Sequence, residues 1–237
     1  MAVETLNHPL SAETGVGRDA QVARPKVAVD TVLFAIERGR LKCYLVQLGA
    51  GAAAGKWAFP GGLVRVGETL DEAARRELYD AARLSNLYLE QLFSFGDPSR
   101  DPGAHVVSVA YMGLIDDAGA VSSGSRKYAA GQWFEVAALP ALAYDHSVMA
   151  EYALRRLKSR LEYTNIACNL LPPTFTFAEL EDLYATVLER PLDRRNFRRR
   201  IMAMGLLKRL AEKRRGPHRP AALYAFRHRG VQVIEML

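Results

Sequence analysis

The chain has 237 residues, of which 49% are hydrophobic and 24% are charged, a balance that predicts one large or two small soluble globular domains. It contains no run of about 18 apolar residues and no N-terminal apolar segment, which argues against a membrane span and a secretory signal peptide. The two cysteines, Cys43 and Cys168, lie far apart, which excludes a disulfide framework and favours a reducing compartment.

The net charge of +6 is distributed unevenly along the chain. Residues 190–229 hold 14 Lys or Arg and 2 acidic residues, whereas residues 1–189 hold 18 basic and 23 acidic residues. A mildly acidic body with a concentrated basic end predicts that the C-terminal part contacts nucleic acid.

The first residues and the strands can be predicted from hydrophobic patterning. Residues 1–24 show no period and few large apolar side chains, so we expect a mobile arm there. Apolar segments then alternate with turns, and we expect extended structure at 27–36, 41–48, 87–95, 106–115 and 132–136. The sequence FGDPSRDP, with its two Asp-Pro pairs, predicts a tight irregular loop.

A helix is predicted to start after Thr69, because Glu72 follows three residues later in a capping-box pattern. Glu77 and Asp80 lie three residues apart on one face of this helix, and paired carboxylates suit Mg²⁺, which proteins hold through a few carboxylates and substrate phosphates. Another face is predicted to be buried because apolar residues recur on it at helical spacing: Leu70, Ala73, Ala74, Leu78 and Ala81.

Residues 62–84 resemble the Nudix box, G-x5-E-x7-R-E-U-x-E-E-x-G-U, in which U is a bulky apolar residue. The matching positions are Gly62, Glu68, Arg76, Glu77, Leu78 and Leu84. The chain has Asp80-Ala81 where the family has Glu-Glu, and Arg83 where the family has a late glycine. Because Ala81 has no ligand atom, the resemblance implies a Nudix-like α/β/α sandwich over about 27–134 with impaired hydrolysis.

The box therefore provides no confident catalytic residue, and its carboxylates and arginine are interpreted as vestigial: Glu68, Arg76, Glu77 and Asp80. No cofactor is required under this interpretation, and at most one weakly bound Mg²⁺ is expected at Glu77 and Asp80. Residual Nudix pyrophosphatase activity is left open.

The C-terminal part has the pattern of a helix-turn-helix. A helix over 145–161 is expected to bridge to it, with an apolar face made of Val148, Met149, Tyr152, Leu154, Leu157 and Leu161. After Pro172-Pro173, a helix is predicted over 176–189, and Asp193 is predicted to cap another over 194–204 that ends at Gly205.

On this last helix, Phe197, Ile201 and Met204 lie at i, i+4 and i+7, the spacing of a helix face that packs against the core, and the opposite face is rich in arginine. Apolar segments 206–212 and 221–226 around a basic Gly/Pro tip predict a β-hairpin wing. We expect DNA contacts, including bidentate arginine–guanine pairs, from Arg194, Arg195, Asn196, Arg198, Arg199, Lys213, Arg214, Arg215 and Arg219. RNA binding, or a solvated basic helix and loop without a partner, are the alternatives.

The degenerate box followed by FTFAELEDLY…RPLDRRNFRRR…GLL…EKRRGPHRPAALY resembles the Nudix-related transcriptional regulators of NAD metabolism, the NrtR family. The resemblance implies an α+β architecture: mobile arm 1–24, Nudix-like effector-sensing domain 25–144, bridging helix and linker 145–172, and winged helix-turn-helix domain 173–237. It implies a homodimeric repressor, cytoplasmic in a bacterium and nucleoid-associated when bound to DNA. Its site is a pseudo-palindromic operator of NAD biosynthesis or salvage genes, from which ADP-ribose or a related nucleotide releases it.

Effector contacts in the former active-site cleft are predicted from six residues. Trp57 or Phe95 is expected to stack on adenine, although a core role is the alternative for both. The other four are assigned to the pyrophosphate or to the effector generally: Lys56, Arg65, Arg100 and His105, of which His105 has a structural role as its alternative.

Three other functions stay open. The chain could be an active Nudix hydrolase that cleaves ADP-ribose or a sugar nucleotide, a pentose-responsive regulator of the same architecture, or an RNA-linked Nudix protein. The sequence does not identify the operator, the effector or the dimer interface.

Overall fold

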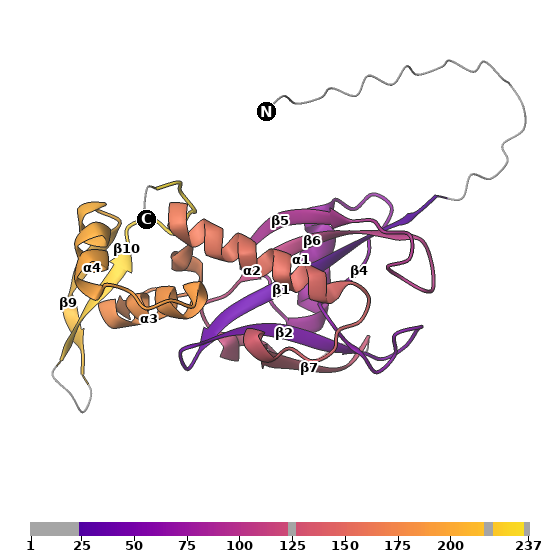
Figure 1. Cartoon of the computed structure of the whole chain (residues 1–237), viewed down its shortest axis with the longest axis horizontal. Helices are drawn as coiled ribbons and strands as arrows, with labels where there is room; N and C mark the ends of the chain where they lie inside the picture. Colours follow the sequence, from indigo (N-terminus) through magenta and orange to yellow (C-terminus); the bar gives the residue numbers. More distant parts are fainter. Residues whose placement is uncertain (1–23, 123–126, 216–219, 235–237) are drawn as a thin grey trace, which may run out of the picture.

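The computed structural model describes residues 24–122, 127–215 and 220–234. It has an N-terminal part built on one large sheet and a C-terminal part with a small sheet and two helices, placed end to end (Figure 1). The predicted arm, except for Arg24, lies outside the described residues. None of the described helices is both long and apolar enough to span a lipid bilayer.

The large sheet contains seven strands in the described chain and has the order β3-β2-β1-β6-β5, with β4 paired to β1 and β7 to β2. The central pair, β1 and β6, is parallel, whereas β1 is antiparallel to β2. The strands are β1 Lys26–Glu37, β2 Arg40–Leu48, β3 Trp57–Ala58, β4 Gly61–Leu63, β5 Tyr88–Phe95, β6 Val106–Leu114 and β7 Tyr128–Glu135.

Helices cover both faces of this sheet. On β1, Leu33 and Ala35 pack in the cluster that contains α1 (Leu70–Ala82), whereas Val32 and Phe34 pack in the cluster that contains α2 (His146–Tyr163). This explains why the strand is apolar on both faces: a strand buried by helices on both sides has no solvent face to alternate with. Short 3-10 helices occupy Ala118–Ala120 and Val136–Ala138.

The predicted capping box at the start of α1 is confirmed. The Thr69 hydroxyl accepts a hydrogen bond from the Glu72 backbone N–H at 3.2 Å, and the Glu72 carboxylate accepts one from the Thr69 N–H at 2.8 Å. These bonds satisfy N–H groups that a helix start otherwise leaves without partners, which fixes the position of the helix that carries the Nudix-like box.

The end of α1 explains why the Nudix box has a glycine at the position of Arg83, and it gives a first prediction. Arg83 has a left-handed φ of 59°, a region that costs most residues ~1–2 kcal/mol and glycine almost nothing. We expect Arg83→Gly to raise the free energy of unfolding by about 1 kcal/mol, measured by urea titration. Gly205, with φ 65° and open space on the side where a Cβ would lie, is the matched control. Gly205→Ala should shift stability by a similar amount in the opposite direction, and a loss of stability in Arg83→Gly would contradict this interpretation.

The predicted bridging helix is present as α2, but one residue of its expected apolar face was assigned wrongly. Val148 is 51% exposed, whereas the neighbouring Met149 is fully buried. The buried line runs through His146, Met149, Ala150, Ala153, Leu157 and Leu161. The buried face of α2 therefore includes two small alanines, Ala150 and Ala153, which an interpretation based on large apolar side chains did not include.

The C-terminal part has the elements expected of a winged helix-turn-helix. A three-stranded sheet has the order β8-β10-β9, α3 packs against β8 and β10, and α4 packs against α3. The elements are the 3-10 helix Ile166–Asn169, β8 Phe175–Thr176, α3 Phe177–Leu188, α4 Arg194–Ala203, β9 Leu207–Arg214 and β10 Ala221–Phe226. The predicted helices and wing hairpin are confirmed, and β9 runs two residues beyond the expected segment.

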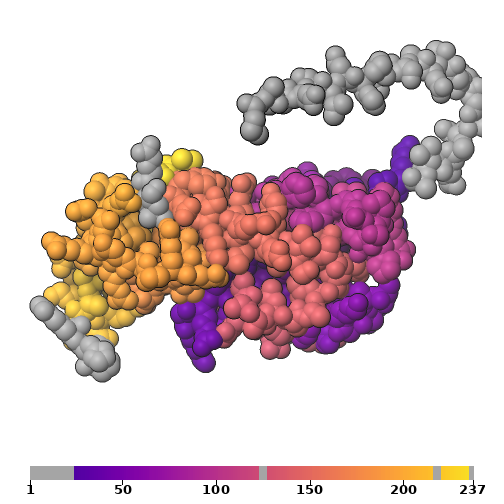
Figure 2. Space-filling view, in the orientation of Figure 1, coloured from indigo at the N-terminus to yellow at the C-terminus, as the bar shows by residue number. Residues whose placement is uncertain are grey.

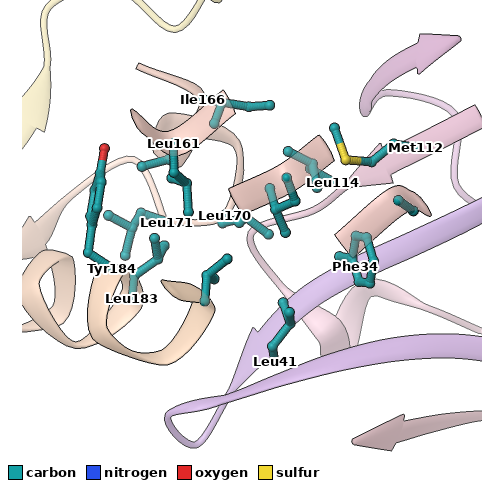
Figure 3. Close-up of a cluster of buried hydrophobic side chains, with 14 of the residues drawn as sticks. Phe34, Leu41, Met112, Leu114, Leu161, Ile166, Leu170, Leu171, Leu183 and Tyr184 are labelled. Atoms are coloured by element: carbon teal, nitrogen blue, oxygen red, sulfur yellow. The ribbon is translucent and has the colours of Figure 1, made fainter. Parts of the chain in front are cut away.

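The two parts share one hydrophobic core. Figure 3 shows Phe34 and Met112 of the large sheet, Leu161 of α2, and Leu183 and Tyr184 of α3 in one buried cluster. In the space-filling view the C-terminal part packs directly against the N-terminal part (Figure 2). The architecture confirms the predicted α+β fold class, while the sequence-based boundaries at residues 144 and 172 stay interpretations.

Candidate effector cavity and DNA-binding face

A cavity of about 460 Å³ lies where β1 and β4 meet the start of α2. This volume is within the range of sites for drug-sized ligands, roughly 300–1,000 Å³. Its polar and aromatic lining comes from segments far apart in the chain: Asp30, Phe59, Arg100, Asp101, Lys127, Tyr144 and His146.

The buried carboxylate of Asp30 organises one wall of the cavity. It accepts a 2.5 Å hydrogen bond from the Ser108 hydroxyl, and His146 Nε2 lies 3.6 Å from its Oδ2. The Phe59 backbone N–H donates to His146 Nδ1 at 3.0 Å, which leaves Nε2 as the protonated nitrogen facing Asp30. A Cβ on Gly61 would lie 2.0 Å from the Asp30 carboxylate, so this position requires glycine.

Arg100 joins the irregular loop after β5 to the first turn of α2. Its Nε and Nη2 donate to the two Asp145 oxygens at 2.9 and 2.6 Å, and Nη2 lies 3.9 Å from Asp30. The side chain of Arg100 is only 3% exposed. Burial opposes the charged form, but the hydrogen bond with Asp145 and the charges of three carboxylates, Asp30, Asp145 and Asp101, outweigh it and raise the pKa of Arg100.

The Nudix-like box forms a second charged network beside the cavity. Arg76 donates to Glu68 at 2.6 and 2.8 Å and also to Glu77, whose carboxylate is buried. The hydrogen bonds from Arg76 lower the pKa of Glu68 to about 2. Lys127, which precedes β7, donates to the other oxygen of Glu77 and to the Gly61 carbonyl.

These contacts bear on whether a divalent metal fits the box. Mg²⁺ needs an octahedral set of oxygens that includes carboxylates available to it. Among the described residues, no group of three or more His, Cys, Asp or Glu side chains is placed to hold a metal ion. Ala81 is 3% exposed and packs in the cluster of Leu33 and Tyr44. This donor set does not fit a resident divalent metal, and weak binding at Glu77 and Asp80 stays a prediction.

Of the six predicted effector residues, all of which the structure describes, Arg100 alone lines the cavity. The Trp57 ring lies 4.8 Å from that of Phe134, and the Phe95 ring packs near Phe93 and Tyr152. The remaining three are exposed: Lys56, Arg65 and His105. Effector contact by these residues stays a prediction.

Sequence reasoning missed Asp30, Lys127, Tyr144 and His146 as lining residues. One signal was present, because Asp30 interrupts an otherwise apolar strand and a charge at a buried strand position needs a partner. The other three follow loops or begin a helix, where polar and aromatic residues are common, so nothing local distinguished them.

The exposed face of α4 is basic, and its arginines differ in how they are held. Among the described residues, Arg195 makes no ion pair, and Arg199 donates to the Asn196 side chain at 2.7 Å. Arg194 lies 3.3 Å from Asp182. Arg198 packs 4.4 Å from the Phe177 ring centroid and donates to the Tyr224 hydroxyl, so it also supports the domain.

The wing continues this basic surface. Lys213 and Arg215 are exposed, and Arg214 pairs with Glu179 at the start of α3. Arg219 lies outside the described residues. The predicted docking side of α4 is confirmed, since Phe197 and Ile201 are buried at 5% and 2% exposure, which directs the arginines away from the core.

Fold and sites together define a Nudix domain fused to a winged helix. Residues 24–155 match the NUDIX domain family, and residues 167–226 match the NrtR DNA-binding winged helix domain. The chain belongs to the NrtR family. It is 32% identical, over 85% of its length and 82% of the relative's, to the ADPR responsive transcriptional repressor NtrR of Acinetobacter baylyi.

Two solved structures support the same assignment. The crystal structure of Shewanella oneidensis NrtR with a 27mer DNA is 30% identical, with a TM-score of 0.75 over 85% of this chain and 93% of that one. The NUDIX domain of the same protein with ADP ribose is 29% identical, with a TM-score of 0.54 over 60% of this chain and 94% of that one.

Proposed function

We propose that this protein is a transcriptional repressor of genes of NAD metabolism whose Nudix cavity binds ADP-ribose or a closely related nucleotide, which releases the protein from DNA. The observation that carries the proposal is the combination of a ligand-sized charged cavity with a basic recognition helix on one shared core. The relatives described above, one named as ADPR responsive and one crystallised with DNA, support both halves.

The DNA partner is a pseudo-palindromic operator bound by a homodimer in the bacterial cytoplasm. Each α4 enters a major groove, and the two copies contact half-sites about one helical turn, or a multiple of it, apart. Such spacing makes affinity sensitive to the angle between the two winged helices, because a small rotation takes one recognition helix out of register.

The path from cavity to DNA runs along α2. Arg100, which lines the cavity, holds Asp145 directly before the first turn of α2, and Leu161 near its last turn packs in the core shared with α3. A ligand that competes for Arg100 or displaces the loop before β6 shifts α2, and the packed core transmits that shift to the winged helix. The ligand changes the equilibrium only to the extent that it binds the two states differently.

The test is a fluorescence-anisotropy titration of the full chain on duplex DNA from its own gene neighbourhood, at fixed salt, with and without ADP-ribose. Fixed salt is needed because phosphate contacts make affinity strongly salt-dependent. Sequence-dependent binding that ADP-ribose abolishes is the expected result. Specific binding that ADP-ribose leaves unchanged would contradict the effector assignment, and absence of specific binding would contradict the repressor assignment.

Arg199→Ala gives a prediction for the recognition helix. Arg199 is exposed on α4, and its only partner among the described residues is Asn196 on the same helix. We expect a loss of roughly 1–3 kcal/mol in operator affinity that is largest for the natural site. Arg75→Ala, an exposed arginine on α1, is the matched control and should leave affinity unchanged. An equal loss on all DNA sequences would assign Arg199 to a phosphate rather than a base.

A further inference from the structure

The ammonium group of Lys127 lies between two oxygens of the kind that hold hard cations. Its Nζ donates to the Gly61 backbone carbonyl at 2.5 Å and to the Glu77 carboxylate. Carbonyl and carboxylate oxygens are the ligands that Mg²⁺ selects in phosphate sites. The chain therefore places its own positive charge where the box carboxylate and a main-chain carbonyl converge.

The surroundings of this ammonium are built around it. A Cβ on Gly62 would lie 2.6 Å from Lys127 Nζ and 2.3 Å from Glu77 Oε1, so the box glycine provides the room that the pair occupies. The Tyr128 hydroxyl donates to the same Gly61 carbonyl at 3.0 Å. The second oxygen of Glu77 accepts from Arg76, so two cations compensate one buried carboxylate.

We propose that Lys127 is the resident cation of the cavity: its ammonium takes the place of a divalent metal between Gly61 and Glu77 and attracts the diphosphate of the ligand. The identity of that ligand rests on the proposed function. Lys127 lines the same cavity as Arg100, and its side chain is 43% exposed.

A clear consequence follows for ligand binding. With Lys127 in place, the diphosphate meets positive charge without an added metal. Without the ammonium, Arg76 is the one cation left on Glu77 among the described residues, and the oxygen that Lys127 held, which lies 3.5 Å from the Tyr128 hydroxyl, repels an anionic ligand. That oxygen and the Gly61 carbonyl then become available to a divalent cation, which can restore the attraction.

The experiment is calorimetric titration of the full chain with ADP-ribose and with inorganic pyrophosphate, in EDTA and in excess Mg²⁺. Wild type should bind equally well in both buffers. Lys127→Met should bind at least about tenfold more weakly in EDTA and recover in Mg²⁺. Lys42→Met is the matched control, because Lys42 pairs with one carboxylate, Glu37, on the β1–β2 hairpin, outside the cavity lining.

A second readout needs no effector. Binding of Mn²⁺, followed by electron paramagnetic resonance, should be much tighter in Lys127→Met than in wild type and in Lys42→Met, in which at most weak binding is expected. If Lys127→Met gains Mn²⁺ binding but neither wild type nor any variant binds ADP-ribose, the proposed effector is contradicted, whereas the role of Lys127 as a substitute for a metal is supported. Equal Mn²⁺ affinity in wild type and Lys127→Met, or a wild type whose ligand binding requires Mg²⁺, would overturn this inference.

Discussion

Arg100→Met is expected to lower the free energy of unfolding by about 3–5 kcal/mol, the cost of removing one partner from a buried ion pair. Arg100 is almost fully buried and holds Asp145 through two hydrogen bonds, with Asp30 close by. Its removal leaves two carboxylates with reduced compensation. Urea unfolding followed by tryptophan fluorescence measures the change, because Trp57 and Trp133 both belong to the large sheet.

The double variant Arg100→Met/Asp145→Asn is the internal control. It removes both charges of the pair, so no carboxylate of that pair stays uncompensated, and it should be more stable than Arg100→Met alone. If Arg100→Met unfolds at the wild-type urea concentration, the pair does not hold the loop to α2, and the proposed path from the cavity loses its first step.

Leu161→Ala should destabilise both parts of the molecule at once, by about 2–5 kcal/mol. Leu161 is fully buried in the cluster that joins the large sheet to α3, so the deletion leaves a cavity between them. Hydrogen exchange measured by mass spectrometry should speed up in β6 and in α3 together.

Val148→Ala on the same helix provides the comparison. Its side chain is 51% exposed, and such surface changes usually stay within about 0.5 kcal/mol. Faster exchange in Leu161→Ala that is confined to α3, with β6 unchanged, would show that the two parts are coupled less tightly than the shared core indicates.

The predictions that succeeded depended on local chemistry. The capping box at Thr69 and the docking stripe of α4 are each decided by side chains within one or two helical turns, so spacing alone indicated them. The prediction for the buried face of α2 was partly wrong, because the small side chains of Ala150 and Ala153 are buried whereas the larger side chain of Val148 is exposed. A helix packed against two partners follows the shape of both, which its own sequence does not contain.

The cavity was the part that the sequence could predict least. Asp30, Arg100 and Asp145 come together through the parallel pairing of β1 with β6 and the return of α2 across the sheet. Neither the strand pairing nor the packing of α2 can be inferred from local spacing, because each brings together segments that are far apart in the sequence. Within the box the departures from the family pattern were visible, but the position of Lys127, which follows the helix by more than 40 residues, was not.

The proposed role of Lys127 as the cation of the cavity would also determine what the sensor is able to measure. A cation that is part of the chain has a fixed stoichiometry, is not removed by chelators, and does not vary with the free magnesium of the cell. Occupancy of the cavity would then depend on the concentration of the nucleotide alone, rather than on the concentrations of both the nucleotide and a divalent cation. A regulator built this way would report the concentration of its nucleotide independently of the concentration of divalent ions around it.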